Sequence, residues 1–288
     1  MTCPGALLFA ALTVGTWNGE WFPSGRAEHR AAPEVESRTI ADAAAMIDEA
    51  LALVDPAGTN DLILCFNEMR RGSAGELLRR LHRRDLAIAI ESGYRRRDRY
   101  DMQQDVIATS LPVVQANWSR WKNAKGETPP RGYAHALVVV SPAVTASVYA
   151  VHLKSNYAQK TPADAELNRV KRRRAVEQLI RQEAPARRRP PSNAIIAGDF
   201  NADAWRREFA ADRIFALLEA AGFANLLSEL SPDRRTTYSG RYGGSALDYI
   251  IVRGFVAEGL PLVYDSGGLS DHNPVFINLV PVSAGGAR

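Results

Sequence analysis

The stretch IIAGDFN, residues 195–201, indicates the fold of this 288-residue chain more clearly than any other segment. Its apolar, β-branched start is typical of a buried strand. The strand ends in Gly198, which lets neighbouring backbone approach closely, and then in Asp199 and Asn201. Side chains alternate along extended backbone, so these two residues can face the same way. The segment therefore predicts a strand whose end presents a carboxylate and an amide together.

Other apolar runs of the chain also end in polar side chains. Asn18 follows the run at 14–17, Glu68 follows the run at 62–66, and His152 follows the run at 147–151. Two further polar positions lie beside such runs, namely Asp248 and the pair Asp271–His272. Ligand crevices of α/β proteins lie outside strand ends, so we expect these side chains to converge on one site.

Short apolar runs alternate with helical patterns, which favours an α/β fold in a single domain, 1–288, with a core of about residues 11–280. The candidate strands are residues 11–16, 62–66, 86–90, 106–109, 136–140, 147–151, 194–197, 247–252 and 274–279. The candidate helices are residues 40–54, 75–83, 163–182 and 214–221, and the first carries an amphipathic stripe. Residues 22–33, 118–132 and 231–245 are expected to be loops.

The composition is that of a globular protein, with 46% hydrophobic and 24% charged residues and a net charge of +4. Cys3 and Cys65 form no disulfide framework or zinc pattern, and the apolar run around Cys65 predicts a buried thiol. No run reaches the roughly 18 apolar residues of a membrane helix. The apolar start, residues 5–14, lacks a preceding basic region and is interpreted as a lead-in to the first strand. The compartment and the oligomeric state stay open, with a cytoplasmic location favoured over secretion and a monomer favoured over an oligomer.

The polar residues at the strand ends suggest a chemistry. Carboxylates and amides without clustered cysteine or histidine favour a hard, oxygen-loving cation such as Mg²⁺ or Mn²⁺. Such a cation stabilises charge on a phosphoryl oxygen. A histidine held by a carboxylate, or a carboxylate itself, can take a proton from water near neutral pH. The inventory indicates metal-assisted hydrolysis of a phosphate ester.

These segments, in their order from Asn18 to His272, resemble the motifs of the endonuclease/exonuclease/phosphatase superfamily, the family of deoxyribonuclease I. The resemblance covers nearly the whole chain. It implies a four-layer sandwich, in which two mixed β-sheets pack face to face and helices lie outside. It also implies a divalent-metal-dependent phosphoesterase.

The resemblance assigns roles to individual residues. Glu68 would be the principal metal ligand, with Asn18 and Asp271 on the metal side. Asp199 would orient or deprotonate the attacking water. Asp248 would orient His272, which would serve as general base or phosphate contact.

The remaining implied roles concern the phosphate. Asn201 would hold it in the transition state, and His152 would stabilise it or assist the leaving group. Arg131 resembles, more loosely, the family's phosphate-binding arginine.

The chain departs from the family pattern at three places. Asn67 stands before Glu68 where the family usually has glutamine, and the segment before Asp248 lacks the frequent arginine. The residues around His152 differ from the Tyr-x-Pro-Asn pattern of abasic-site endonucleases. No segment clearly supplies a carboxylate partner for His152, for which Asp98, Asp101 and Asp105 are the candidates.

Arginine-rich clusters suggest contacts with a polyanion, although a solvated surface is the favoured explanation for any one of them. The clusters lie at residues 79–80, 83–84, 95–97, 171–174, 187–189, 206–207 and 234–235. Those at 95–99 and 234–235, in expected loops of the active face, are the better candidates for substrate contact. Trp118 and Trp121 could stack on a base or cover a sheet edge. His29, His82 and His135 belong to no motif and are expected to be structural or exposed.

Three functions remain to be compared. The first is a nuclease with nucleic acid as its substrate, which the motifs and basic clusters favour. The second is a phosphatase or phosphodiesterase acting on a small-molecule or lipid phosphate, such as an inositol phosphate or sphingomyelin. The third, a binder with a decayed site, is disfavoured because every proposed catalytic position holds the expected type of residue.

Overall fold

The computed structural model describes residues 11–25, 31–96, 99–100, 103–122, 127–156, 160–183, 193–240 and 243–282. The first sheet contains β1 (Leu12–Phe22), β2 (Asp61–Met69), β3 (Ala87–Glu91), β6 (Gln104–Thr109), β15 (Phe255–Val263) and β16 (Val275–Pro281), in the order β15-β16-β1-β2-β6-β3. The second sheet contains β7 (Val113–Arg120), β8 (Gly132–Ser141), β9 (Val144–His152), β10 (Asn193–Asp199), β11 (Ala224–Asn225) and β14 (Asp248–Arg253), in the order β11-β14-β10-β9-β8-β7.

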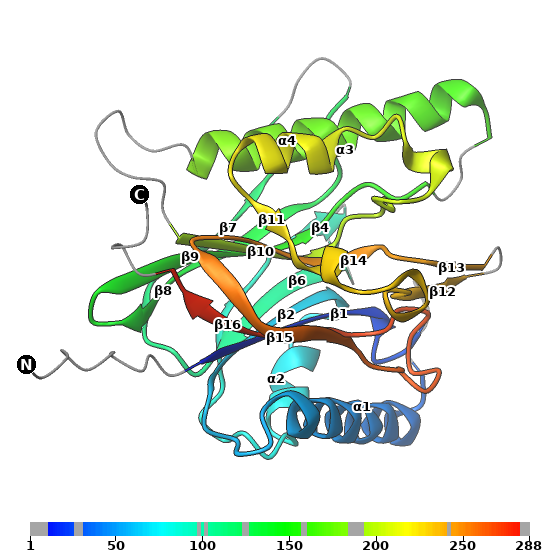
Figure 1. Ribbon diagram of the computed structural model, residues 1–288. Helices are drawn as coiled ribbons and strands as arrows, with labels where there is room; N and C mark the ends of the chain where they lie inside the picture. Colours follow the sequence, from blue (N-terminus) through cyan, green and yellow to red (C-terminus); the bar gives the residue numbers. More distant parts are fainter. Residues whose placement is uncertain are drawn as a thin grey trace, which may run out of the picture.

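Helices cover the outer faces of both sheets (Figure 1). They are α1 (Pro33–Val54), α2 (Ser73–Leu78), α3 (Pro162–Glu183) and α4 (Ile214–Ala220). Three 3₁₀ helices, η1 (Arg207–Phe209), η2 (Leu226–Glu229) and η3 (Pro232–Arg234), lie in the connections. Two short hairpins complete the described part, β4 (Arg95–Arg96) with β5 (Arg99–Tyr100), and β12 (Tyr238–Gly240) with β13 (Gly243–Ser245).

Apolar side chains fill the spaces between these layers. Val14 and Ile63 of the first sheet belong to one buried cluster with Val148 and Ile196 of the second. The apolar stripe of α1, including Ile47, packs on the opposite face of the first sheet in a second cluster. Helices α3 and α4 cover the outer face of the second sheet, as the layers of Figure 1 show. The predicted four-layer sandwich with two mixed sheets is confirmed.

Both sheets contain a parallel pair of strands, and these pairs position the polar residues. In the first sheet β1 is parallel to β2, and in the second β9 is parallel to β10. Strands β16 and β14 are antiparallel to β1 and β10, so they begin where β1 and β10 end. Six strand termini from both sheets therefore meet at one end of the sandwich.

The structure corrects several boundaries. All nine predicted strands and four predicted helices are present, but α1 begins at Pro33, seven residues before its apolar stripe. Proline suits the first turn of a helix because its missing N–H has no intrahelical partner there. Strands β7 and β15 were not predicted. Residues 118–120 of the expected loop at 118–132 belong to β7. The expected loop at 231–245 contains η3, β12 and β13.

Cys65 is completely buried and free, as predicted, whereas Cys3 and most of the apolar start lie outside the described residues. Within the described part of the chain, no helix is both long enough and apolar enough to span a bilayer.

Candidate active site

The register of the strands brings Asp199 between two other predicted site residues. Asp199, the last residue of β10, pairs with His152 at the end of β9 and with Asp248 at the start of β14. In the facing sheet, Asn18 of β1 pairs with Asn67, the residue before Glu68. The segment before β16 adds Asp271 and His272. The structure therefore brings all of these strand-end residues to one place.

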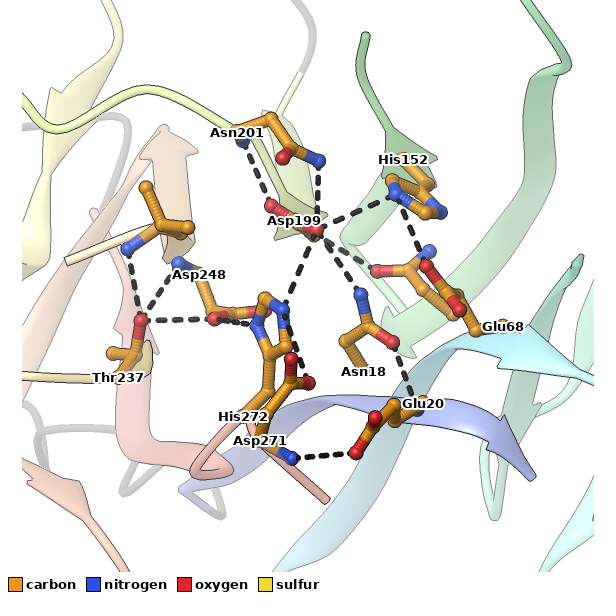
Figure 2. A network of polar contacts seen from close by, with 12 residues as sticks. Asn18, Glu20, Glu68, His152, Asp199, Asn201, Thr237, Asp248, Asp271 and His272 are labelled. Carbon is orange, nitrogen blue, oxygen red and sulfur yellow. Dashed lines mark hydrogen bonds and ion pairs between the residues drawn. The ribbon is translucent and has the colours of Figure 1, made fainter. Parts of the chain in front are cut away.

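The Asp199 carboxylate is the centre of this group (Figure 2). It accepts hydrogen bonds from the Asn18 side chain (3.0 Å), from the Asn201 backbone N–H (2.8 Å) and from the Asn201 side chain (2.8 Å). All three donors are amides, which fix the orientation of the carboxylate. Its Oδ2 also lies 3.4 Å from His152 Nε2 and 3.9 Å from His272 Nε2. A buried carboxylate thus stands between two imidazole rings.

A second carboxylate holds the His272 ring. Nδ1 of His272 lies 2.7 Å from Oδ2 of Asp248, and Thr237 Oγ1 donates to the same oxygen at 2.8 Å. Thr237 Oγ1 in turn accepts from the backbone N–H groups of Leu247 and Asp248. This arrangement leaves His272 Nε2 facing Asp199 and Asp271. The sequence did not indicate Thr237, since a threonine in a polar loop carries no signal of its own.

His152 is bonded differently from His272. Its Nε2 lies 3.6 Å from Glu68 Oε1 and 3.4 Å from Asp199 Oδ2. Its Nδ1 is buried and has no partner among the described residues. Of the three candidate carboxylate partners, Asp98 and Asp101 lie outside the described residues, and Asp105 bonds to other residues.

The buried Asp105 is instead connected to the backbone of Asp199 through the side chain of Asn67. Asp105 Oδ1 accepts from the Asn67 side chain (2.7 Å), and Oδ2 accepts from the Tyr94 hydroxyl (3.0 Å). Asn67 Oδ1 then accepts from the backbone N–H of Asp199 (3.0 Å). Asn67, which departs from the family's usual glutamine, therefore connects the first sheet to the end of β10.

Gly198 permits this close approach. Its φ is +140°, and a Cβ there would lie 2.0 Å from the carbonyl oxygen of Val151 and 2.8 Å from Asn67 Oδ1. Any other residue would push β10 away from β9 at the residue before Asp199.

Glu20 is a site residue that the sequence did not indicate. Its Oε2 accepts from the backbone N–H of Asp271 (3.0 Å), and its own N–H donates to Asn18 Oδ1 (3.1 Å). Ser270 Oγ donates to the backbone oxygen of Asn18 at 2.7 Å. The end of β1 thereby fixes the segment that carries Asp271 and His272.

Arg131 lies beside His152 and makes contacts with neutral groups. Its guanidinium donates to the backbone oxygens of His152 (3.2 Å) and Leu153 (2.8 Å) and to Gln103 Oε1 (2.8 Å). These bonds hold a positive charge at the end of β9, close to Glu68, where it opposes the rise in the Glu68 pKa that burial causes.

Strained backbone marks the same region. Among the described residues, positive φ at non-glycine positions occurs at Glu20, Trp21, Glu68, Arg131 and Asn201. Four of these belong to the group described above, and Trp21 follows Glu20. Such conformations cost on the order of 1–3 kcal/mol each and cluster where function constrains the backbone.

Burial and mutual repulsion shift the pKa values of the acidic groups upwards. Burial raises the pKa of Asp199 to about 7, although His272 opposes the shift. Burial also raises the pKa of Glu68, and burial together with the charge of Glu68 raises that of Asp271. Burial and the charge of Asp271 raise the pKa of Glu20. The carboxylates therefore crowd one another, and a bound cation would relieve the repulsion.

The two histidines shift in opposite directions. Burial alone would lower the pKa of His272, but the charges of Asp248 and Asp199 outweigh it and raise the pKa to about 10. For His152, burial and the charge of Arg131 lower the pKa well below its usual value. The surroundings thus favour the protonated form of His272 and the neutral form of His152.

The tryptophans and arginine clusters that the sequence suggested as substrate contacts differ in their exposure. Trp121 is buried against Tyr133 and presents no face to a base, whereas Trp118 is 38% exposed on β7 and contacts Tyr94. Arg172, in the basic cluster of α3, is buried in an ion pair with Asp212 and is not a surface residue. The cluster at 187–189 and His29 lie outside the described residues.

The other two histidines without a motif follow expectation. The His82 side chain is 88% exposed, and His135 stacks on Tyr149 with a centroid distance of 4.6 Å.

The comparison with known families is decisive. A model described as the Endonuclease/Exonuclease/phosphatase family matches residues 15–272. The chain belongs to the endonuclease/exonuclease/phosphatase family. This member of the family is therefore an enzyme, a hydrolase of the phosphoesterase and nuclease type. A comparison with curated protein sequences gave no match.

Solved structures of this family share its fold. A humanized TDP2 from D. rerio is 16% identical, with a TM-score of 0.62 over 94% of this chain and 99% of that chain. A family protein from Leptotrichia buccalis is 13% identical, with a TM-score of 0.64 over 94% and 100%. The human Nocturnin catalytic domain with bound sulfate is 15% identical, with a TM-score of 0.60 over 94% and 95%.

The family generally depends on divalent metals, and this member has a buried group of Asp199, Asp248 and His272 with ligand atoms within 4.8 Å of one another. One oxygen of Asp248 is already bonded within this group, while its Oδ1 has no partner among the described residues. Asp248 Oδ2 contacts His272 Nδ1 and accepts a hydrogen bond from Thr237. Glu68 and Asp271 are more accessible, with side chains 12% and 38% exposed. Their oxygens suit a hard cation.

Proposed function

We propose that this enzyme is a nuclease that hydrolyses nucleic-acid phosphodiester bonds with Mg²⁺ or Mn²⁺. The observation that carries the proposal is the Asp199 carboxylate, which three amide donors orient and two histidines flank. A fixed carboxylate of this kind can orient a water and accept its proton. The groups around it supply what a phosphodiester needs, namely ligands for a cation and donors for the phosphate oxygens.

We assign the cation to Glu68 and Asp271, with Asn18 beside them. The support is chemical, since these residues offer oxygen donors, and burial together with neighbouring carboxylates raises the pKa values of Asp271 and Glu20. When bound, a divalent cation supplies charge stabilisation on a phosphoryl oxygen and lowers the pKa of bound water. Glu20 holds the backbone of Asp271 and so keeps its carboxylate at the end of β1.

Asp199 is assigned to the attacking water. The support is its position, since Asp199 lies between both histidines and its carboxylate contacts Asn18 of the other sheet. The amide donors to its oxygens keep the carboxylate in one orientation while a proton is transferred.

The phosphate is assigned to His272, Asn201, His152 and Arg131. His272, held through Nδ1 by Asp248, directs Nε2–H towards the charge that develops on the phosphate oxygens. The Asn201 side chain and the Arg131 guanidinium both lie beside the backbone oxygen of Leu153 and add donors on the side of β9. His152 Nε2 lies between Glu68 and Asp199 and completes this side.

Basic and aromatic side chains around the site favour nucleic acid over a small or lipid phosphate. Arg235 lies on the ring of Trp205 (3.8 Å). Positive charge and aromatic rings together are typical of single-strand contacts. A D. rerio TDP2 of the same fold was solved in complex with a single-strand DNA product.

The test is hydrolysis of supercoiled plasmid and of single-stranded DNA and RNA in the presence of Mg²⁺, with and without chelator. Parallel assays measure phosphate release from inositol phosphates and phosphocholine release from sphingomyelin. The proposal predicts chelator-sensitive cleavage of nucleic acid. Release from a small or lipid substrate with nucleic acid untouched would replace the nuclease with the alternative function.

A further inference from the structure

Arg235 and Trp205 form a stacked pair next to the active site that the reaction itself does not use. The guanidinium carbon of Arg235 lies 3.8 Å from the centroid of the Trp205 ring. Trp205 packs against the core and has Tyr249 at a centroid distance of 6.0 Å. The ring is therefore a fixed support, on which the long Arg235 side chain is held in one place.

The loops that carry the pair are joined by hydrogen bonds. Asp203 Oδ1 accepts from the backbone N–H groups of Trp205 (2.9 Å) and Arg206 (3.1 Å), and Oδ2 accepts from that of Ala246 (2.9 Å). Arg206 Nη1 donates to Ser245 Oγ at 2.7 Å. On the side of Arg235, the backbone N–H of Thr237 donates to the backbone oxygen of Ser245 (3.0 Å), so these bonded segments form one unit that carries the stacked pair.

This unit is continuous with the site. Trp205 follows Asn201 by four residues, and Arg235 precedes Thr237 by two. Thr237 contacts the Asp248 carboxylate, and the ring of the next residue, Tyr238, lies 4.9 Å from that of His272. The backbone at Arg235 is thus at most about 7 Å from that of a residue in direct contact with the site. The β12–β13 hairpin extends from the same region, beside β14 (Figure 1).

The charge of Arg235 is not neutralised within the described part of the chain, where no carboxylate lies within ion-pair distance. The adjacent Arg234 lies elsewhere, in a depression shared with Leu53, Glu258 and Leu260. A pre-ordered guanidinium with no acidic partner, next to a phosphoesterase centre, is suited to bind a phosphate through two parallel hydrogen bonds.

We propose that Arg235, supported by Trp205, binds a phosphate adjacent to the scissile one, so that the enzyme prefers a polynucleotide to an isolated phosphodiester. The inference rests on the proposed nuclease function and names the part of the substrate that this function leaves open. Arg235 is a specificity-determining residue, and bond cleavage at the reacting phosphate does not require it.

The experiment compares two substrates of different length. Bis(4-nitrophenyl) phosphate contains one phosphodiester and no neighbouring phosphate, whereas a single-stranded oligonucleotide contains many. The variants are Arg235→Ala, Arg235→Lys and, as the matched control with the same loss of charge, Arg234→Ala. Thermal unfolding confirms that each variant is folded.

For the oligonucleotide, Arg235→Ala should lower kcat/KM about 10- to 100-fold, mainly through KM, as expected for one charge-assisted contact. The dependence of log(kcat/KM) on log[salt] should become shallower by about 0.7, the value for one phosphate of a single strand. Arg235→Lys should fall between the wild type and the alanine variant. Hydrolysis of bis(4-nitrophenyl) phosphate should not change, and Arg234→Ala should resemble the wild type on both substrates.

Two results would overturn the inference. An equal loss on both substrates would place Arg235 at the reacting centre, and unchanged oligonucleotide kinetics would show that Arg235 does not contact the substrate.

If the wild type hydrolyses no nucleic acid, the proposed function fails, and binding then tests Arg235 separately. Fluorescence anisotropy of a labelled oligonucleotide, measured in chelator, should show weaker binding to Arg235→Ala than to Arg234→Ala. Equal binding by the two variants would reject the contact.

Discussion

Asp199 lies between two histidines that the surrounding residues hold in different charge states. Asp248 contacts one ring nitrogen of His272 at 2.7 Å and stabilises the imidazolium, whereas His152 has only longer contacts and lies near the charge of Arg131. The strand-end carboxylate is thus flanked by a cation on one side and a neutral ring on the other. The largest contribution to this difference is the charge of Asp248, with Asp199 and Asp271 adding to it.

Replacement of Asp199 by Asn tests the residue that we assign to the attacking water. The amide keeps the size of the side chain but removes the proton acceptor, so kcat should fall at least about 10²- to 10⁴-fold. Hydrolysis of bis(4-nitrophenyl) phosphate, with circular dichroism as the control for folding, measures the effect. A folded variant with nearly wild-type kcat would remove Asp199 from the reaction.

The buried carboxyl of Asp105 should make the free energy of unfolding depend on pH. Burial raises the pKa of its carboxyl from 3.8 to about 7, so between these pH values the folded protein binds a proton that the unfolded chain has released. Stability contributed by this group is therefore present below about pH 4 and is lost as pH rises towards 7. Asp105→Asn removes the titration and keeps the acceptor for Asn67.

Urea unfolding of both proteins at pH 5 and pH 7 measures this contribution. The free energy of unfolding of the wild type, relative to Asp105→Asn, should fall by on the order of 2 kcal/mol between the two pH values. A constant difference would show that Asp105 has an ordinary pKa.

The elements that carry the site were predictable from the sequence, while the edges of the sheets were not. The apolar runs before Asn18, Glu68, His152 and Asp199 are central strands, where burial imposes a clear pattern. Strand β15 is an edge strand, and its pattern is broken by Gly259, Pro261 and a register shift between Glu258 and Leu262. Strand β7 is also an edge, and its mostly exposed side chains show no apolar periodicity.

Gly198→Ala tests the close approach of β9 and β10. The new Cβ would meet the Val151 carbonyl and Asn67 Oδ1, and alanine disfavours a φ of +140°. We expect a loss of at least about 2 kcal/mol in the free energy of unfolding. Activity at a temperature where the variant remains folded should also fall, because the Asn67 bond to the Asp199 backbone is displaced. Chemical unfolding measures the first effect, and an unchanged midpoint would contradict the packing described here.

At the scale of the molecule, residues from Asn18 to His272 meet because a parallel pair in each sheet ends at the same end of the sandwich. The family resemblance indicated the positions Asn18, Glu68, His152, Asp199 and His272, since each lies in a recognisable local motif. It did not indicate Glu20, whose contact with Asp271 spans 251 residues and needs a left-handed backbone. Nor did it indicate that Asn67 connects Asp105 to Asp199. Such contacts depend on tertiary structure and leave no local pattern.

The position of a bound cation tests the central claim most directly. Crystals grown or soaked with Mn²⁺ allow the ion to be located from its anomalous scattering. We predict one strong peak within about 2.5 Å of a Glu68 carboxylate oxygen, on the side of Asp271 and Asn18. A peak bound instead by Asp248 and His272, or an ordered crystal that contains Mn²⁺ elsewhere and none at Glu68, would contradict the account.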